Sequence, residues 1–166
     1  MTLTTHAVAG AAIISFMPNH ALLGVCLAFG SHFLLDAIPH YDYEIKSASV
    51  NPDIGAKMKL NKNLFKDMIR IGFDGLFGLF ISLIFFGIFA PLWIIALGAF
   101  FGMLPDPLQF VYAHFKHEPL VSLQRFHQWI HSKNHLLNKP VFGFISQLAL
   151  LCAIIILSLL LHQTFL

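Results

Sequence analysis

Four potential metal ligands lie close together at the end of an otherwise apolar segment: His32, Asp36, His40 and Asp42. His32 and Asp36 are four residues apart, so on a helix of 3.6 residues per turn they project from one face. Pro39 ends that helix and leaves His40 and Asp42 in the turn that follows. Imidazole and carboxylate together suit zinc, manganese or iron better than calcium or copper, and the spacing leaves the choice among the three open.

A structural alternative exists for the same residues. On a soluble helix, a histidine and an aspartate four residues apart commonly cap carbonyl groups or pair with a lysine. The rest of the chain decides between the two interpretations, because a metal centre needs further ligands from other segments.

The composition predicts a membrane protein. Of the 166 residues, 57% are hydrophobic and 11% charged, and the mean hydropathy is +0.75. A net charge of +2, without interleaved basic and aromatic residues, argues against a nucleic-acid partner. Cys26 and Cys152 lie in apolar runs, where they act as small hydrophobic residues. No basic residue precedes the first apolar stretch, so we interpret it as a retained segment.

The apolar runs predict an all-α fold, an integral membrane bundle of about five helices forming one domain over residues 1–166. The expected helices cover residues 3–17, 21–38, 64–89, 92–104 and 141–161. The first and fourth are short, because their unbroken apolar runs of about 13 to 15 residues fall below the roughly 20 that cross a hydrocarbon core. Polar loops at about 40–66 and 116–139 connect the helices, and a further helix is expected at 108–115 along the interface.

Charge distribution gives this bundle an orientation. If all five segments cross the membrane, all ten Lys and Arg and all eight Asp and Glu lie on the same side as the N-terminus. The positive-inside rule assigns that side to the cytoplasm. We therefore expect a multi-pass chain with its polar chemistry at the cytoplasmic face.

The topology brings candidate ligands from five separate regions of the chain to the cytoplasmic face. Asp74 lies inside the third apolar segment, where an ionised side chain costs on the order of 3 kcal/mol unless it is paired, so a metal is its expected partner. The predicted metal ligands are His6, His32, Asp36, His40, Asp74, Asp106, His127 and His131.

So many ligands leave room for two or more divalent transition-metal ions. Such ions lower the pKa of a bridging water and neutralise charge that develops on a substrate oxygen, which suits a phosphoester. A carboxylate that is not used for ligation acts as the general base, and Asp42 and Asp106 are the candidates. At the membrane face, the expected substrate is a phosphoester of a lipid head group.

Three segments resemble a known family, the bacterial inner-membrane-associated metal-dependent hydrolases that include the LexA-binding type. These segments are Thr5-His6 with Gly10, the run Gly102-Met103-Leu104-Pro105-Asp106, and His127-Gln-Trp-Ile-His131-Ser132, which is similar to a His-Arg-x-x-Thr-His-Ser motif. The chain departs from that pattern at Leu108, where many members carry a second aspartate. The resemblance implies a hydrolase in the bacterial inner membrane.

A second resemblance concerns Ser31-His32-Phe-Leu-Leu-Asp36, which is similar to the His-x-x-x-Asp element of the zinc-dependent phospholipase C and nuclease superfamily. It implies a helical, multi-zinc phosphodiesterase site, and zinc is therefore the expected metal.

A non-enzymatic membrane protein is the alternative, with the His and Asp residues in a structural role. It would be a docking protein whose loops bind a protein partner, or a metal or proton transporter. Transport requires polar residues across the whole bilayer, but no charged residue occurs from Gly75 to Pro105 or from Pro140 onward. Transport therefore ranks below docking.

Overall fold

Helices account for most of the residues that the computed structural model describes, which are 1–42, 45–49, 57–58, 61–132 and 140–165. A 3-10 turn, Pro18–His20, two antiparallel two-residue strands, β1 (Ala48–Ser49) and β2 (Lys57–Met58), and short connections make up the rest. The helices are α1 (Leu3–Ser15), α2 (Ala21–Asp36), α3 (Lys62–Phe86), α4 (Leu92–Met103), α5 (Pro105–Phe115), α6 (Leu120–Ile130) and α7 (Pro140–Phe165). The predicted all-α bundle is confirmed.

Two helices beyond the five expected apolar segments lie between Pro105 and Ile130, and the first of them, α5, contains the helix expected at 108–115. Proline is common in the first turn of a helix, because the backbone N–H groups there have no hydrogen-bond partner within the helix. Pro105 therefore begins α5 directly after α4, and the two helix axes differ by 52°. The predicted polar loop at 116–139 contains α6, whose buried side carries Gln124 and His127.

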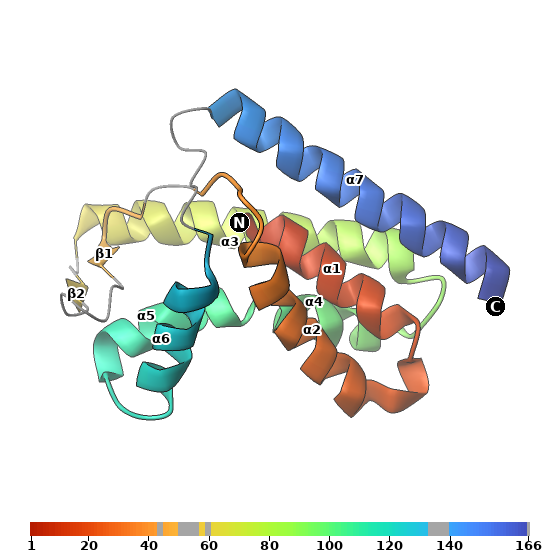
Figure 1. The fold of residues 1–166 in the computed structure, drawn as a ribbon, viewed down its shortest axis with the longest axis horizontal. Helices are drawn as coiled ribbons and strands as arrows, with labels where there is room; N and C mark the ends of the chain where they lie inside the picture. The colour runs from red at the N-terminus through yellow and green to blue at the C-terminus, as the bar shows by residue number, and fades with distance from the viewer. Residues whose placement is uncertain (43–44, 50–56, 59–60, 133–139, 166) are drawn as a thin grey trace.

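Three of the helical segments are long and apolar enough to cross a membrane: Pro18–Asp36, Lys62–Phe86 and Val141–Thr164. The bent pair of α4 and α5 is a fourth candidate. Figure 1 shows α3 and α7 as the longest helices, with the shorter α1, α2 and α4 beside them. The predicted short first and fourth segments are confirmed, since α1 has 13 residues and α4 has 12.

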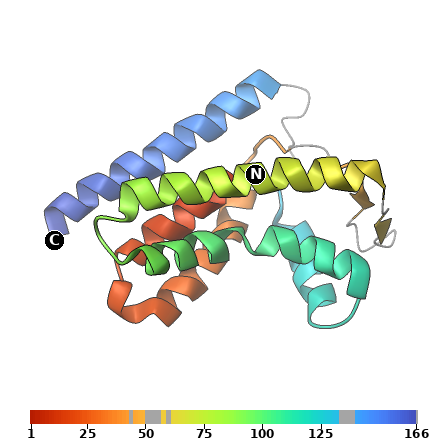
Figure 2. The same ribbon diagram turned by 180° about the vertical axis from the view of Figure 1, so that it is seen from behind.

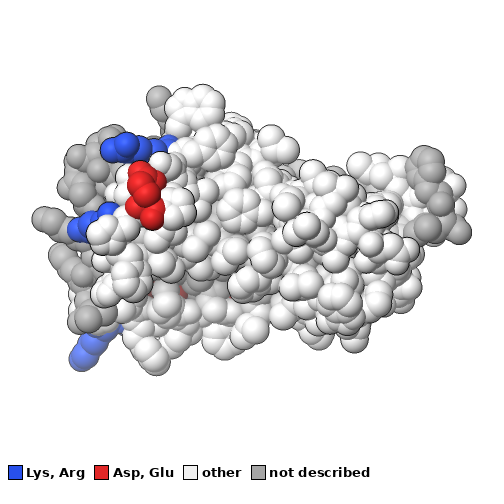
Figure 3. Space-filling model, turned by 90° about the horizontal axis from the view of Figure 1, so that it is seen from below, with Lys and Arg blue, Asp and Glu red and all other residues white. Residues whose placement is uncertain are grey.

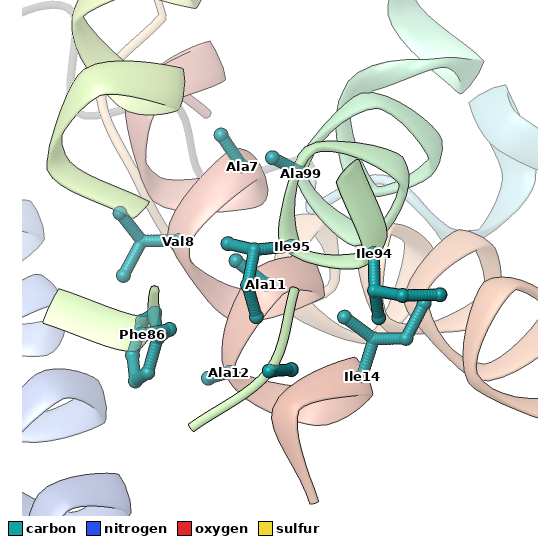
Figure 4. Close-up of a cluster of buried hydrophobic side chains, with 10 residues drawn as sticks. Ala7, Val8, Ala11, Ala12, Ile14, Phe86, Ile94, Ile95 and Ala99 are labelled. Carbon is teal, nitrogen blue, oxygen red and sulfur yellow. The ribbon is translucent and has the colours of Figure 1, made fainter. Parts of the chain in front are cut away.

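α1 is the centre of the bundle. Every residue of α1 except Ile13 is buried, and the helix contacts α2, α3, α4 and α7. Its side chains meet Phe86 of α3 and Ile95 of α4 in the apolar cluster of Figure 4, where Val8 and Ile14 extend from α1. A helix that is apolar on all sides is stable only when other helices enclose it. α1 therefore holds the other helices in place.

Glycines let the backbones of α1 and α4 approach closely. A Cβ atom at Gly102 would collide with the carbonyl oxygen of His6, and one at Gly10 would collide with the carbonyl oxygen of Gly98. Small residues at a helix interface allow such contact in membrane bundles. The close approach places His6 of α1 beside the end of α4.

The polar parts of the chain gather at one end of the molecule. The strands, α5, α6 and the first turns of α3 share that end in both ribbon views (Figures 1 and 2). On the face in Figure 3, the charged side chains likewise lie toward one end, and the remainder is uncharged. The described charges are therefore segregated along the long axis, as expected for a chain that enters a membrane.

We predict that Gly102→Ala destabilises the bundle, because its new methyl group must displace the backbone of α1. Overpacking of this kind costs about 1–3 kcal/mol, which a lower thermal denaturation midpoint in detergent would report. Gly30→Ala is the matched control, since a Cβ atom there has no neighbour within 4 Å. Equal midpoints for the two variants would contradict the close α1–α4 contact.

Candidate metal centre

Four helices, and the turns that follow two of them, bring histidines and aspartates to one buried place near the polar end of the bundle. His6 comes from α1, His32 and Asp36 from α2, and His127 from α6. The other members are His40 and Asp42, directly after α2, Asp106 in the first turn of α5, and His131, directly after α6. The side chains of His6, His32 and Asp36 are completely buried. The expected convergence of these segments is present in the structure.

The carboxylate of Asp36 lies at the centre of the group. The Nε2 atoms of five histidines lie within 4 Å of its oxygens: His127 at 2.9 Å, His6 and His32 at 3.2 Å, His40 at 3.7 Å and His131 at 3.8 Å. The i, i+4 spacing of His32 and Asp36 produces one of these contacts, as the sequence predicts. His40 is also four residues from Asp36, in the turn after the helix, and the other three contacts depend on tertiary packing.

Backbone carbonyl groups fix the tautomers of two of these rings. The Nδ1–H of His32 donates to the carbonyl of Gly102 at 2.9 Å, and that of His40 donates to the carbonyl of Ile38 at 2.6 Å. In a neutral imidazole the proton on Nδ1 leaves a lone pair on Nε2. The Nε2 atoms of both rings therefore face Asp36, and each could bind a metal ion when its ring is neutral, as in metal-ligating histidines whose Nδ1–H is hydrogen-bonded.

His131 has the same orientation. Its Nδ1 lies 3.3 Å from the carbonyl oxygen of Ser132, and its Nε2 faces Asp36 and Asp42. Burial lowers the pKa of His131 and outweighs the opposite effect of the two carboxylates, so the ring is neutral at pH 7. A neutral imidazole is the form that binds a metal.

Two of the imidazole nitrogens that lie beside Asp36 lack a hydrogen bond. The Nε2 atoms of His6 and His32 are buried without a hydrogen-bond partner among the described residues, and their rings stack at 3.8 Å. Buried polar atoms without partners are costly. A divalent cation bound by these nitrogens and by Asp36 would satisfy them together.

Two sets of ligand atoms are close enough to hold a metal ion each. The first contains His32, Asp36, Asp106 and His127, and the second contains Asp36, His40 and His131. Within each set the ligand atoms lie within 4.8 Å of one another. Asp36 belongs to both sets, so its two oxygens could bridge two ions. Such mixed imidazole and carboxylate sets are typical of transition-metal sites.

Asp42 lies at the edge of the group and remains accessible, with 28% of its side chain exposed. Its oxygens lie 3.1 Å from the Nε2 of His40 and 2.6 Å from the α-amino group of Met1, which is also 3.2 Å from Asp36. Burial raises the pKa of the Asp42 carboxyl, but hydrogen bonding to His40 and the positive amino group outweigh it, so the pKa lies below its usual range. Asp42 is therefore ionised at neutral pH.

Glutamine side chains support the ligands, and the sequence analysis did not identify them. Gln109 of α5 donates to Asp106 at 2.9 Å, and buried Gln124 of α6 donates to Gln109 at 3.2 Å. Gln124 precedes His127 by three residues on the same side of α6, and that spacing was the available signal.

Gln147 connects α7 to the same region. Its side chain donates to the carbonyl of Tyr41 at 2.5 Å and accepts from the backbone N–H of Thr2 at 3.0 Å. It therefore holds the turn that carries His40 and Asp42 against the start of α1. A buried amide inside a long apolar run marks a position with a specific partner, so this residue could have been found.

Asp74 has a different partner from the metal that the sequence analysis expects. Its carboxylate accepts hydrogen bonds from the backbone N–H groups of Leu3 at 2.6 Å and Thr4 at 3.3 Å, and from the Thr4 hydroxyl at 2.6 Å. The first N–H groups of a helix have no partner within the helix. The carboxylate of Asp74, on α3, is the acceptor for these N–H groups of α1.

The structure thus brings together seven of the eight predicted metal ligands. Six of them belong to the two sets, and His6 lies against Asp36 beside them, whereas Asp74 belongs to neither set. No protein-family model, curated protein or solved structure matches the chain, so functional arguments depend on its own residues.

We predict that Asp36→Asn abolishes metal retention, because the shared carboxylate loses its charge. Mass spectrometry of the elements in purified, dialysed protein should detect near-stoichiometric transition metal in the unmodified chain and little in this variant or in His32→Ala.

Asp74→Ala is the matched control for the loss of a buried carboxylate. It should lower the thermal midpoint, since removing a cap costs about 0.5–2 kcal/mol, but metal content should stay unchanged. Loss of metal from a folded Asp74→Ala protein would instead indicate that Asp74 is a metal ligand.

Proposed function

We propose that this chain is a membrane-bound, metal-dependent hydrolase that cleaves a phosphoester at the membrane interface. The observation that carries the proposal is the convergence of five imidazole Nε2 atoms on the single carboxylate of Asp36. A structural network would pair each buried polar atom, but here the Nε2 atoms of His6 and His32 have no hydrogen-bond partner among the described residues. Cations are the simplest complement to that arrangement.

Zinc is the proposed metal, with one ion held by each of the two sets and Asp36 shared between them. The histidine-rich composition of the ligands supports zinc over calcium or magnesium, which prefer oxygen ligands. The resemblance of the His32–Asp36 element to zinc-dependent phospholipases and nucleases agrees with this choice. When bound, such ions activate a water and neutralise charge on a phosphoryl oxygen.

Asp42 is the proposed general base. It belongs to neither ligand set, it is ionised, and it is accessible at the edge of the centre. Asp106 was the other candidate, but its Oδ1 lies 3.5 Å from His32 and accepts from Gln109, which supports a role as ligand. His40 and His131 flank Asp42 and hold its carboxylate beside the second set.

A lipid head group is the proposed substrate, because the metal centre lies near the depth in the bundle at which charged side chains first appear along α3. Asp74 is level with the first residues of α1 through its hydrogen bonds to Leu3 and Thr4. Arg70 precedes Asp74 by one turn of α3, which is about 6 Å along the helix axis. Ester phosphates of membrane lipids occupy this zone. We place the centre at the cytoplasmic face of a bacterial inner membrane, in line with the positive-inside rule and the family resemblance.

We predict that Asp42→Asn separates catalysis from metal binding. The variant should keep its metal and its thermal midpoint, and its rate of hydrolysis should fall about 10²- to 10⁴-fold, the usual contribution of a general base. The assay uses bis(p-nitrophenyl) phosphate and, separately, phospholipid vesicles. Asp106→Asn is the control, and it should lose metal and activity together.

Two results would count against this function. If the purified chain contains no transition metal and is fully stable, the hydrolase hypothesis fails. If metal is present but no phosphoester is cleaved, the alternative of a docking protein gains support, provided that a protein partner still binds after His32→Ala.

A further inference from the structure

The first turns of α3 carry two parallel rows of exposed side chains. Lys62, Lys66 and Arg70 form a basic row, and Phe65, Ile69 and Phe73 form an apolar row. Within each row the residues are four apart, so the rows run side by side along the helix. We call this pair of rows the α3 lipid face.

Both rows are open to the surroundings. Phe65 is 70% exposed, Ile69 44% and Phe73 73%. The opposite side of α3 is the packed side, because Asp67 is buried there and accepts from the backbone N–H groups of Lys46 and Ser47. Among the described residues, no salt bridge is formed by Lys62 or Lys66, and Arg70 is exposed although it lies near enough to Asp67 to interact with its charge.

Most of the exposed charges that the structure describes at this end of the molecule are positive. They comprise six exposed cationic residues and one exposed acidic residue, Glu118. The cationic residues are Lys46, Lys62, Lys66, Arg70, Lys116 and Arg125. The complementary partner is therefore anionic.

We propose that the α3 lipid face binds anionic phospholipids of the bilayer that surrounds the protein. The basic row receives the phosphate groups and the apolar row receives the first part of an acyl chain. This binding is independent of any chemistry at the metal centre and goes beyond the proposed hydrolase function.

The apolar row distinguishes a lipid from other anions. It continues along α3 into the candidate span through Phe77, Phe80 and Ile84, which are also exposed. A soluble phosphate would need the basic row alone. An acyl chain uses both rows, because burying apolar surface from water adds to the attraction between phosphate and lysine.

The test compares lipid selectivity in two variants that each lose three positive charges. The full chain is reconstituted into phosphatidylcholine vesicles with trace nitroxide-labelled phosphatidylglycerol or phosphatidylcholine, and electron paramagnetic resonance measures the protein-bound fraction of each. Lys62→Gln/Lys66→Gln/Arg70→Gln should lose the preference for phosphatidylglycerol by roughly fivefold or more, since one basic residue at an anionic surface already contributes about that factor. Lys46→Gln/Lys116→Gln/Arg125→Gln should keep most of the preference.

Further measurements separate the proposal from general effects. The charge-preserving variant Lys62→Arg/Lys66→Arg/Arg70→Lys should retain the preference, which excludes simple misfolding, and all variants should keep their metal content. Glycerol phosphate should fail to compete with the labelled lipid. Equal loss of preference in both charge-removing variants, or loss in neither, overturns the assignment to α3, and competition by glycerol phosphate overturns the role of the acyl chain.

Discussion

The structure depends on one buried carboxylate, Asp36, which five imidazoles face from several helices. Hydrogen bonds from Nδ1 to backbone carbonyls turn the Nε2 atoms of His32 and His40 toward this carboxylate. A metal ion at this point would be bound by imidazole nitrogens and by the carboxylate together. The candidate metal centre follows from this convergence rather than from the number of histidines.

Packing of α1 against α4 makes this arrangement possible. Gly10 and Gly102 allow the two backbones to meet, and the meeting brings the His6 ring over His32, whose Nδ1–H reaches the carbonyl of Gly102. The same glycines thus determine both the helix contact and the orientation of two rings. A change in their packing would alter the centre without touching a ligand.

Sequence reasoning predicted the all-α fold, the short first and fourth segments and most residues of the centre, because each has a local signal. Apolar run length indicates helices, and the four-residue spacing of His32 and Asp36 places them on one face. Other features have no local signal. The direction of α5 depends on how Pro105 is accommodated after α4, and α6 is too amphipathic to resemble a membrane helix. The contact of Gln147 with Thr2 and Tyr41 joins residues more than a hundred positions apart.

Asp74 needs a partner, as the sequence indicates, but the partner in the structure is the start of α1 and not a metal ion. A carboxylate inside an apolar helix needs compensation, and the sequence analysis assigned that role to a metal because the other candidate ligands lie at the same depth. The start of α1 offers the same compensation, since its first N–H groups also lack partners and carry partial positive charge. Both needs are met when α3 lies against α1, as the bonds from Leu3 and Thr4 to Asp74 show. Asp74 thereby holds the start of α1 against α3.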